Sequence, residues 1–208
     1  MEMKYVWWVS GGIVFLLALW WLFSGGQSVS SFKNYPPRNE TIVAFGDSLV
    51  QGIGASEGKD LFSQVESLTG KRIINKGVSG NTTRDGLNRI DEVLDEEPGV
   101  VIVVLGGNDY LRQVPIEETF QNLRAIVSRL QKAGAVVIVA GVRGGVVSDR
   151  FAPEYEALTE EYNAGYVPNI LKGLIARDEY MSDAIHPNDA GYAIIAARIA
   201  PLIEELYK

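Results

Sequence analysis

Short apolar runs alternate with helical patterns along most of this chain. Five runs are rich in β-branched residues and nearly continuous in apolarity: Thr41–Phe45, Arg72–Asn75, Val100–Leu105, Val136–Ala140 and, more weakly, Tyr166–Ile170. Strands covered on both faces of a sheet have this composition. The helical stretches between and after them are Leu61–Leu68, Gly86–Leu94, Pro115–Lys132, Glu154–Tyr162 and Ala190–Leu206. The alternation predicts an α/β fold, a parallel sheet with helices on both faces.

Composition narrows the chemistry that such a fold can support. The chain has 208 residues, a formal net charge of −7 and no run of Lys and Arg, so nucleic acid is not an expected partner. It has no cysteine, which excludes disulfides, thiolate metal sites and a cysteine nucleophile. It has one histidine, His186. One domain of ordinary size is expected once the first thirty or so residues are set aside.

The N-terminal segment Val6–Phe23 reads VWWVSGGIVFLLALWWLF and contains no charged residue. Eighteen helical residues span about 27 Å, close to the hydrocarbon thickness of a bilayer. Tryptophans lie near both ends, where the two bilayer interfaces would be. We therefore expect a transmembrane helix in an anchor of residues 1–25, a tether of residues 26–39 and a folded domain of residues 40–208. A cleaved signal peptide is the rival interpretation, although this apolar stretch is longer than is usual for one.

The positive charges near this segment give its orientation. Lys4 precedes the segment closely, whereas Lys33 and Arg38 follow it at some distance. This pattern favours a single-pass membrane protein with its N-terminus inside and its domain outside the cytoplasm.

Polar clusters follow the expected strands, where working residues gather in parallel sheets. The first strand ends in Gly46-Asp47-Ser48-Leu49, Gly80 follows the second, and Gly106-Gly107-Asn108-Asp109 follows the third. Asp183 and His186 precede the last helix. Taken alone, each cluster is more typical of a turn or a helix cap than of catalysis.

Taken together, the clusters predict a serine hydrolase. The spacing of Asp183 and His186 lets the carboxylate hold one ring nitrogen and leave the other free as a base. Ser48 supplies a candidate nucleophile, and a glycine N–H and an asparagine amide are groups that stabilise an oxyanion. A metal site is a weak rival because one histidine with scattered carboxylates is a poor zinc set.

The four blocks, in this order, resemble the SGNH hydrolases, also called GDSL esterases and lipases. The likeness extends over about residues 39–206 and is greatest to the bacterial acyl-CoA thioesterase, lysophospholipase and arylesterase subgroup. It implies a three-layer α/β/α sandwich with a five-stranded parallel sheet of the flavodoxin-like kind, and no metal or organic cofactor. It also implies roles by position. Ser48 is the nucleophile, His186 the general base and Asp183 its orienting acid, with the Ser48 and Gly80 N–H groups and the Asn108 side chain as the oxyanion hole.

The expected activity is hydrolysis of acyl esters or thioesters. Tyr110 and Leu111, together with the loop Val142–Tyr155, are expected to shape the acyl pocket. A lysophospholipid or another medium-chain acyl ester is the expected substrate because the anchor would hold the site near the bilayer through Val6–Phe23. A carbohydrate or cell-wall acetylesterase is the alternative within the family, and a membrane-anchored binding module without activity is the alternative outside it. The sequence leaves the oligomeric state open.

Overall fold

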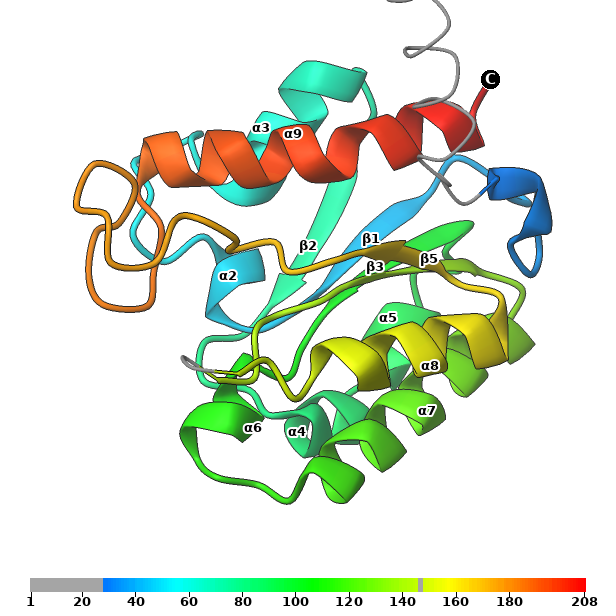
Figure 1. Ribbon diagram of the computed structural model, residues 1–208. Coiled ribbons are helices and arrows are strands. Elements are labelled where there is room, and N and C mark those ends of the chain that lie inside the picture. Colours follow the sequence, from blue (N-terminus) through cyan, green and yellow to red (C-terminus); the bar gives the residue numbers. More distant parts are fainter. Residues whose placement is uncertain (1–27, 146–147) are drawn as a thin grey trace, which may run out of the picture.

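A five-stranded parallel sheet forms the centre of the computed structural model, which describes residues 28–145 and 148–208 (Figure 1). The strands are β1 (Ile42–Gly46), β2 (Ile73–Gly77), β3 (Val100–Val104), β4 (Val136–Ala140) and β5 (Gly165–Val167). Their order is β2-β1-β3-β4-β5, and all neighbours are parallel. This is the flavodoxin-like order of a doubly wound sheet. The predicted α/β class with a five-stranded parallel sheet is confirmed.

Helices cover both faces of the sheet, as Figure 1 shows. One layer contains α2 (Ser48–Gln51), α3 (Leu61–Thr69) and α9 (Asp189–Leu206). The other is built mainly from α7 (Ile116–Lys132) and α8 (Ala152–Tyr162), with α4 (Thr83–Asn88), α5 (Asp91–Leu94) and α6 (Gly107–Leu111) beside them. A short 3₁₀ helix, η1 (Val29–Ser31), precedes the sheet.

The two faces of each strand belong to different cores. On β1, Ile42 and Ala44 pack in the core with α3 and α9, whereas Val43 and Phe45 pack in the core with α7 and α8. Alternate side chains of a strand point to opposite faces, so a strand buried on both faces needs apolar residues at every position. This explains why the strands appear in the sequence as continuous apolar runs.

The helix expected at Gly86–Leu94 is two short helices, α4 and α5, so that prediction is wrong. Arg89 leaves the helical backbone region, with φ of −112°, and turns its side chain inward to the ends of two strands. The fifth strand is also shorter than expected and ends at Val167, directly before Pro168. Proline has no N–H to donate to a neighbouring strand.

The N-terminal anchor, including Val6–Phe23, lies outside the described residues. None of the helices in the described part of the chain combines the length and apolarity that a bilayer span requires. The tether of residues 26–39 is described from Ser28 onward, and this part packs against the domain. Phe32 is 4% exposed, and the Asn34 side chain donates to the carbonyls of Gln131 and Ala135 at 2.8 and 2.9 Å. Residues 28–39 are therefore attached to the domain and do not form a free linker.

This attachment predicts that Phe32→Ala destabilises the domain. The ring packs against Gly165 of β5, where an added Cβ would lie 3.0 Å from it. Removing a buried phenylalanine leaves a cavity, and we expect a loss of about 3 kcal/mol in the free energy of unfolding, measured with urea. Lys33→Ala is the matched control because that side chain is exposed, and it should change stability by less than about 0.5 kcal/mol. Equal stability of the Phe32 variant and the wild type would contradict the packing.

Candidate active site

Ser48 lies at the start of α2, directly after β1. The Asp47 side chain caps this helix by accepting the Leu49 N–H at 3.0 Å. Position 46 requires glycine because β3 lies so close that a Cβ there would be 2.3 Å from the carbonyl oxygen of Val104. The first N–H groups of a helix have no partner within it, and the Ser48 N–H has no acceptor among the described residues. The Ser48 backbone therefore offers a donor beside its own hydroxyl.

His186 joins Ser48 to Asp183 across the sheet edge. Its Nε2 lies 3.0 Å from Ser48 Oγ, and its Nδ1 lies 2.7 Å from Asp183 Oδ2. The expected short turn between Asp183 and His186 is thus present, and it directs the second ring nitrogen to the serine. This is the geometry that nucleophilic catalysis by serine requires.

Three donors hold the Asp183 carboxylate. Oδ2 accepts from the His186 ring, and Oδ1 accepts the backbone N–H groups of Ile185 and His186, each at 2.8 Å. The hydrogen bond from the His186 side chain and these two backbone bonds lower the pKa of Asp183 to about 2. The carboxylate stays ionised across the pH range in which esterases operate, although its side chain is half exposed.

The remaining oxyanion candidates come from two neighbouring segments. Gly80 follows β2 with φ of +80°, and its N–H has no acceptor in the part of the chain that is described. Asn108 is the second residue of α6, directly after β3. Its Nδ2 already donates to Asp47 Oδ2 at 3.1 Å and to the Asn81 carbonyl at 3.0 Å. A primary amide has two N–H bonds, so both are engaged here, and an oxyanion would have to share or replace one of these acceptors.

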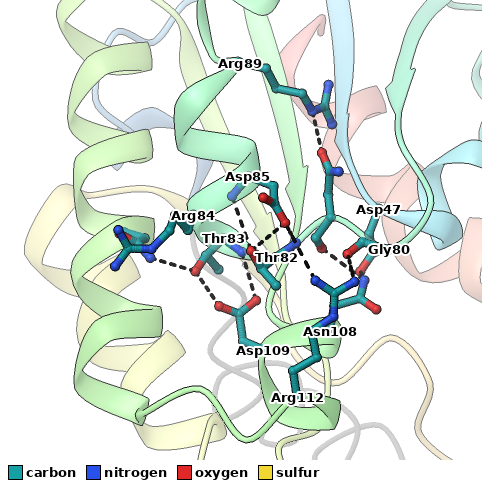
Figure 2. A network of polar contacts seen from close by, with 12 residues as sticks. Asp47, Gly80, Thr82, Thr83, Arg84, Asp85, Arg89, Asn108, Asp109 and Arg112 are labelled. Atoms are coloured by element: carbon teal, nitrogen blue, oxygen red, sulfur yellow. Dashed lines mark hydrogen bonds and ion pairs between the residues drawn. The ribbon is translucent and has the colours of Figure 1, made fainter.

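Hydrogen bonds fasten the loop after β2 to α6, as Figure 2 shows. Asn108 donates to the Asn81 carbonyl, Arg112 donates to the Gly80 carbonyl at 2.8 Å, and the Asp109 carboxylate accepts the N–H and hydroxyl of Thr83 at 2.8 and 2.6 Å. Asp109 and Thr83 are fully buried, where hydrogen bonds are strong and costly to lose. The two segments are therefore held together by several side-chain hydrogen bonds.

Asp47 is a buried carboxylate beside the nucleophile. It is 2% exposed, and its two oxygens accept from Leu49 N–H and from the Asn108 amide. Burial raises its pKa to about 6, although the bond from Leu49 and the charge of His186 act in the opposite direction. Asp47 is thus ionised at neutral pH and becomes protonated in mild acid.

A cavity of about 230 Å³ opens at Ser48 and His186. Tyr110 and Leu111, the two expected pocket residues, line it. Most other wall residues are apolar: Leu49, Val142, Leu171, Ile175, Ala184 and Ile185. Among the large apolar lining residues, Leu111, Ile175 and Ile185 are 42–53% exposed at the surface. The arrangement suits an apolar substrate group beside the serine hydroxyl.

Neither a metal nor a cofactor is needed to account for the polar groups of the site. Within residues 28–145 and 148–208, no three His, Asp or Glu side chains are grouped closely enough to hold a metal ion. The acidic, basic and amide groups beside Ser48 are engaged with one another.

Comparison with known proteins places this geometry in a family. Residues 44–194 match the model of the GDSL-like lipase/acylhydrolase family. The chain belongs to this family. It is a hydrolase that acts on ester bonds, and the resemblance noted in the sequence is confirmed.

Individual relatives of the GDSL-like family carry related activities in their names. An arylesterase of Vibrio mimicus is 31% identical over 185 residues, which cover 82% of this chain and 90% of the relative. Thioesterase 1/protease 1/lysophospholipase L1 of Escherichia coli is 28% identical over 176 residues, covering 80% of this chain and 85% of the relative. The crystal structure of AlinE4, an SGNH-hydrolase family esterase, superposes with a TM-score of 0.64 at 36% identity, covering 78% of this chain and 94% of AlinE4.

The structure brings Ser48, His186 and Asp183 into direct contact and places Asn108 beside Asp47. Gly80 lies on the neighbouring loop but does not line the cavity. No role was predicted for Leu171, Ile175 or Ile185, which form much of the cavity wall. Their only signal was their apolar character in loops close to Asp183 and His186.

The raised pKa of Asp47 predicts a pH-dependent stability. A folded-state pKa above the unfolded value means that stability is fully present below about pH 4 and is lost as pH rises through about 6. From pH 4 to pH 7, the loss from this one group is roughly 2 kcal/mol. Asp47→Asn removes it, so the stability of the variant relative to wild type should increase by about that amount between these pH values.

Urea unfolding at pH 4 and pH 7 measures this difference, and effects of the substitution that do not depend on pH cancel. Asp95→Asn, on the exposed surface, controls for the loss of one negative charge. An equal response of the Asp47 and Asp95 variants to pH would show that the folded-state pKa of Asp47 is not raised.

Proposed function

We propose that this hydrolase cleaves acyl esters or thioesters through an acyl-enzyme on Ser48. The observation that carries the proposal is the continuous hydrogen-bonded path from Ser48 Oγ through the His186 ring to the Asp183 carboxylate. In a structure without substrate, a nucleophile and base at 3.0 Å are already within the distance for proton transfer.

The mechanism follows from these contacts. His186 Nε2 takes the Ser48 proton while the serine oxygen attacks the substrate carbonyl carbon. Asp183 stabilises the resulting imidazolium and fixes its orientation. The Ser48 and Gly80 N–H groups and the Asn108 amide receive the oxyanion. His186 then gives the proton to the leaving alcohol or thiol, and the same base activates water to release the acid and restore Ser48.

The substrate in this proposal carries a medium-length acyl chain, such as a lysophospholipid. The apolar walls of the cavity beside Ser48 support this class, since each buried methylene contributes about 0.8 kcal/mol. The name of the Escherichia coli relative includes thioesterase and lysophospholipase, which accords with acyl substrates of this kind.

We further propose that Val6–Phe23 anchors the domain in a membrane, with the site outside the cytoplasm. The uncharged eighteen-residue stretch and its flanking tryptophans support this localisation. The described chain is packed on the domain from about Val29 onward, so few residues separate the anchor from the catalytic domain. A site held near the bilayer would meet single-chain lipids at high local concentration.

An acyl-ester series tests the proposed reaction and substrate class together. With p-nitrophenyl esters from acetyl upward, kcat/KM should rise about fourfold per methylene while the chain still enters the cavity. Ser48→Ala should abolish this hydrolysis and labelling by a fluorophosphonate. Ser79→Ala, an exposed serine in the loop before Gly80, is the control and should retain both.

Labelling that persists in Ser48→Ala would refute the nucleophile. A maximum at the acetyl ester would favour an acetylesterase over the medium-chain assignment. An intact fold with no turnover at any chain length would indicate a binding module.

The anchor predicts a membrane-bound full-length protein. Wild type should remain in the membrane fraction after alkaline carbonate extraction. Replacing Val14 and Leu16 with arginine should release the protein, because charges near the centre of a span cost about 2.5–3.5 kcal/mol each. Replacing the same two residues with isoleucine keeps the apolarity and should keep the protein bound. Release of the wild type by carbonate would contradict anchoring.

A further inference from the structure

Arg89 is a largely buried cation beneath the candidate site. Its side chain is 13% exposed, and the nearest carboxylate, that of the exposed Glu92, lies 3.5 Å away. The remaining contacts are neutral. Nε donates to Asn81 Oδ1 at 2.6 Å, and Nη2 donates to the carbonyls of Gly46 and Lys76 at 2.8 and 2.9 Å. The guanidinium also lies over the Phe45 ring, 4.6 Å from its centre.

These contacts close a ring of interactions around the oxyanion candidates. We call the ring the oxyanion frame and define it by Gly46, Asp47, Asn108, Asn81 and Arg89. Gly46 and Asp47 are bonded along the chain, and the other four links are hydrogen bonds. Asp47 accepts from the Asn108 amide, that amide also donates to the Asn81 carbonyl, and the Asn81 side chain accepts from Arg89, which returns to the Gly46 carbonyl. Figure 2 shows Arg89 at one end of this network and Asp47 and Asn108 at the other.

The oxyanion frame fixes all three oxyanion candidates. Gly46 and Asp47 lead directly into Ser48, and Asn81 directly follows Gly80. The Asn108 amide is held between the two segments. A displacement of the Asn81 peptide therefore moves Gly80 and changes the orientation of Asn108 at the same time.

Arginine is the side chain suited to this position. The planar fork presents Nε and Nη2 in fixed directions, so one group reaches acceptors from the end of β1, the end of β2 and the loop after β2. A lysine has one nitrogen and cannot replace this geometry. Burial lowers the pKa of the guanidinium, so the contacts offset a real desolvation cost.

We propose that Arg89 is a positioning residue for ester hydrolysis, which sets the Ser48, Gly80 and Asn108 donors at the oxyanion through the oxyanion frame. This inference rests on the proposed function, because it assigns Arg89 a part in the same reaction. Arg89 does not line the cavity. Its effect should therefore fall on the transition state and leave substrate binding unchanged.

The test measures kcat and KM with the preferred p-nitrophenyl ester in Arg89→Lys, Asn81→Leu and the double variant. Active-site titration with a fluorophosphonate counts the folded enzyme, so that kcat refers to competent sites alone. We expect kcat in Arg89→Lys to fall about 10- to 100-fold with KM within about threefold of wild type, as for a misplacement on the order of 1 Å. Arg124→Lys, which alters an arginine paired with Glu161 away from the cavity, should leave both constants unchanged.

The double variant decides whether the two residues act through one ring. Once one substitution has broken the oxyanion frame, a second should lower kcat little further. The kcat of the double variant should therefore be no more than about threefold below that of the worse single variant. Losses that multiply would show independent effects and overturn the proposal. An unchanged kcat per titrated site in Arg89→Lys, with only a lower melting temperature, would also overturn it.

If Arg89→Lys does not fold, Asn81→Leu carries the test alone, since it leaves both carbonyl contacts of Arg89 in place. Normal kcat in that variant would overturn the proposal. Failure of the proposed function is a separate result, because wild type itself would then show no turnover that depends on Ser48.

Discussion

The position of β1 between β2 and β3 is the constraint on which the site depends. In the parallel register, Gly46 lies opposite Gly77 on one side and Val104 on the other. The segments that follow these three strands therefore leave the sheet side by side and carry Ser48, Gly80 and Asn108. The fit is tight enough that a Cβ on Gly46 would overlap the Val104 carbonyl. Ser48, the proposed nucleophile, is thus placed by close packing of the backbone at the end of β1.

Asp183 and Asp47, the two carboxylates near Ser48, have pKa values shifted in opposite directions by their surroundings. Asp183 is half exposed but accepts three hydrogen bonds, and its pKa falls to about 2. Asp47 is buried with fewer donors, and its pKa rises to about 6. In the proposed mechanism Asp183 stabilises an imidazolium, for which a permanent charge is an advantage, whereas Asp47 accepts from the neutral Asn108 amide. Burying ionised Asp47 at neutral pH lowers the free energy of unfolding, and the same carboxylate holds the Asn108 amide in a fixed orientation.

The sequence predicted the features that depend on local pattern. Strands buried on both faces are visible as β-branched runs, and α7 was predicted from Pro115 and the acidic residues that follow it. Ser48, Asp183 and His186 could be found because the chain has one histidine and a short Asp-to-His spacing. The division of Gly86–Leu94 could not be found in this way. It follows from Arg89, whose acceptors include backbone carbonyls of β1 and β2, and every residue has such a carbonyl. The contacts of Asn81 could not be predicted for the same reason, because one of them is made by its backbone carbonyl.

The strand order also separates the proposed catalytic residues from most of the apolar cavity wall. Ser48, Gly80 and Asn108 follow β1, β2 and β3, on one half of the sheet. Val142 follows β4, and Leu171 and Ile175 follow β5, so these cavity walls come from the other half. Tyr110 and Leu111 stand at the boundary, on α6. The segments of the first half are joined to one another by side-chain hydrogen bonds, whereas Leu111, Ile175 and Ile185 remain substantially exposed. If the proposed function holds, the loops after β4 and β5 could change in length and apolarity, and with them the acyl group that fits the cavity, without moving Ser48, Gly80 or Asn108.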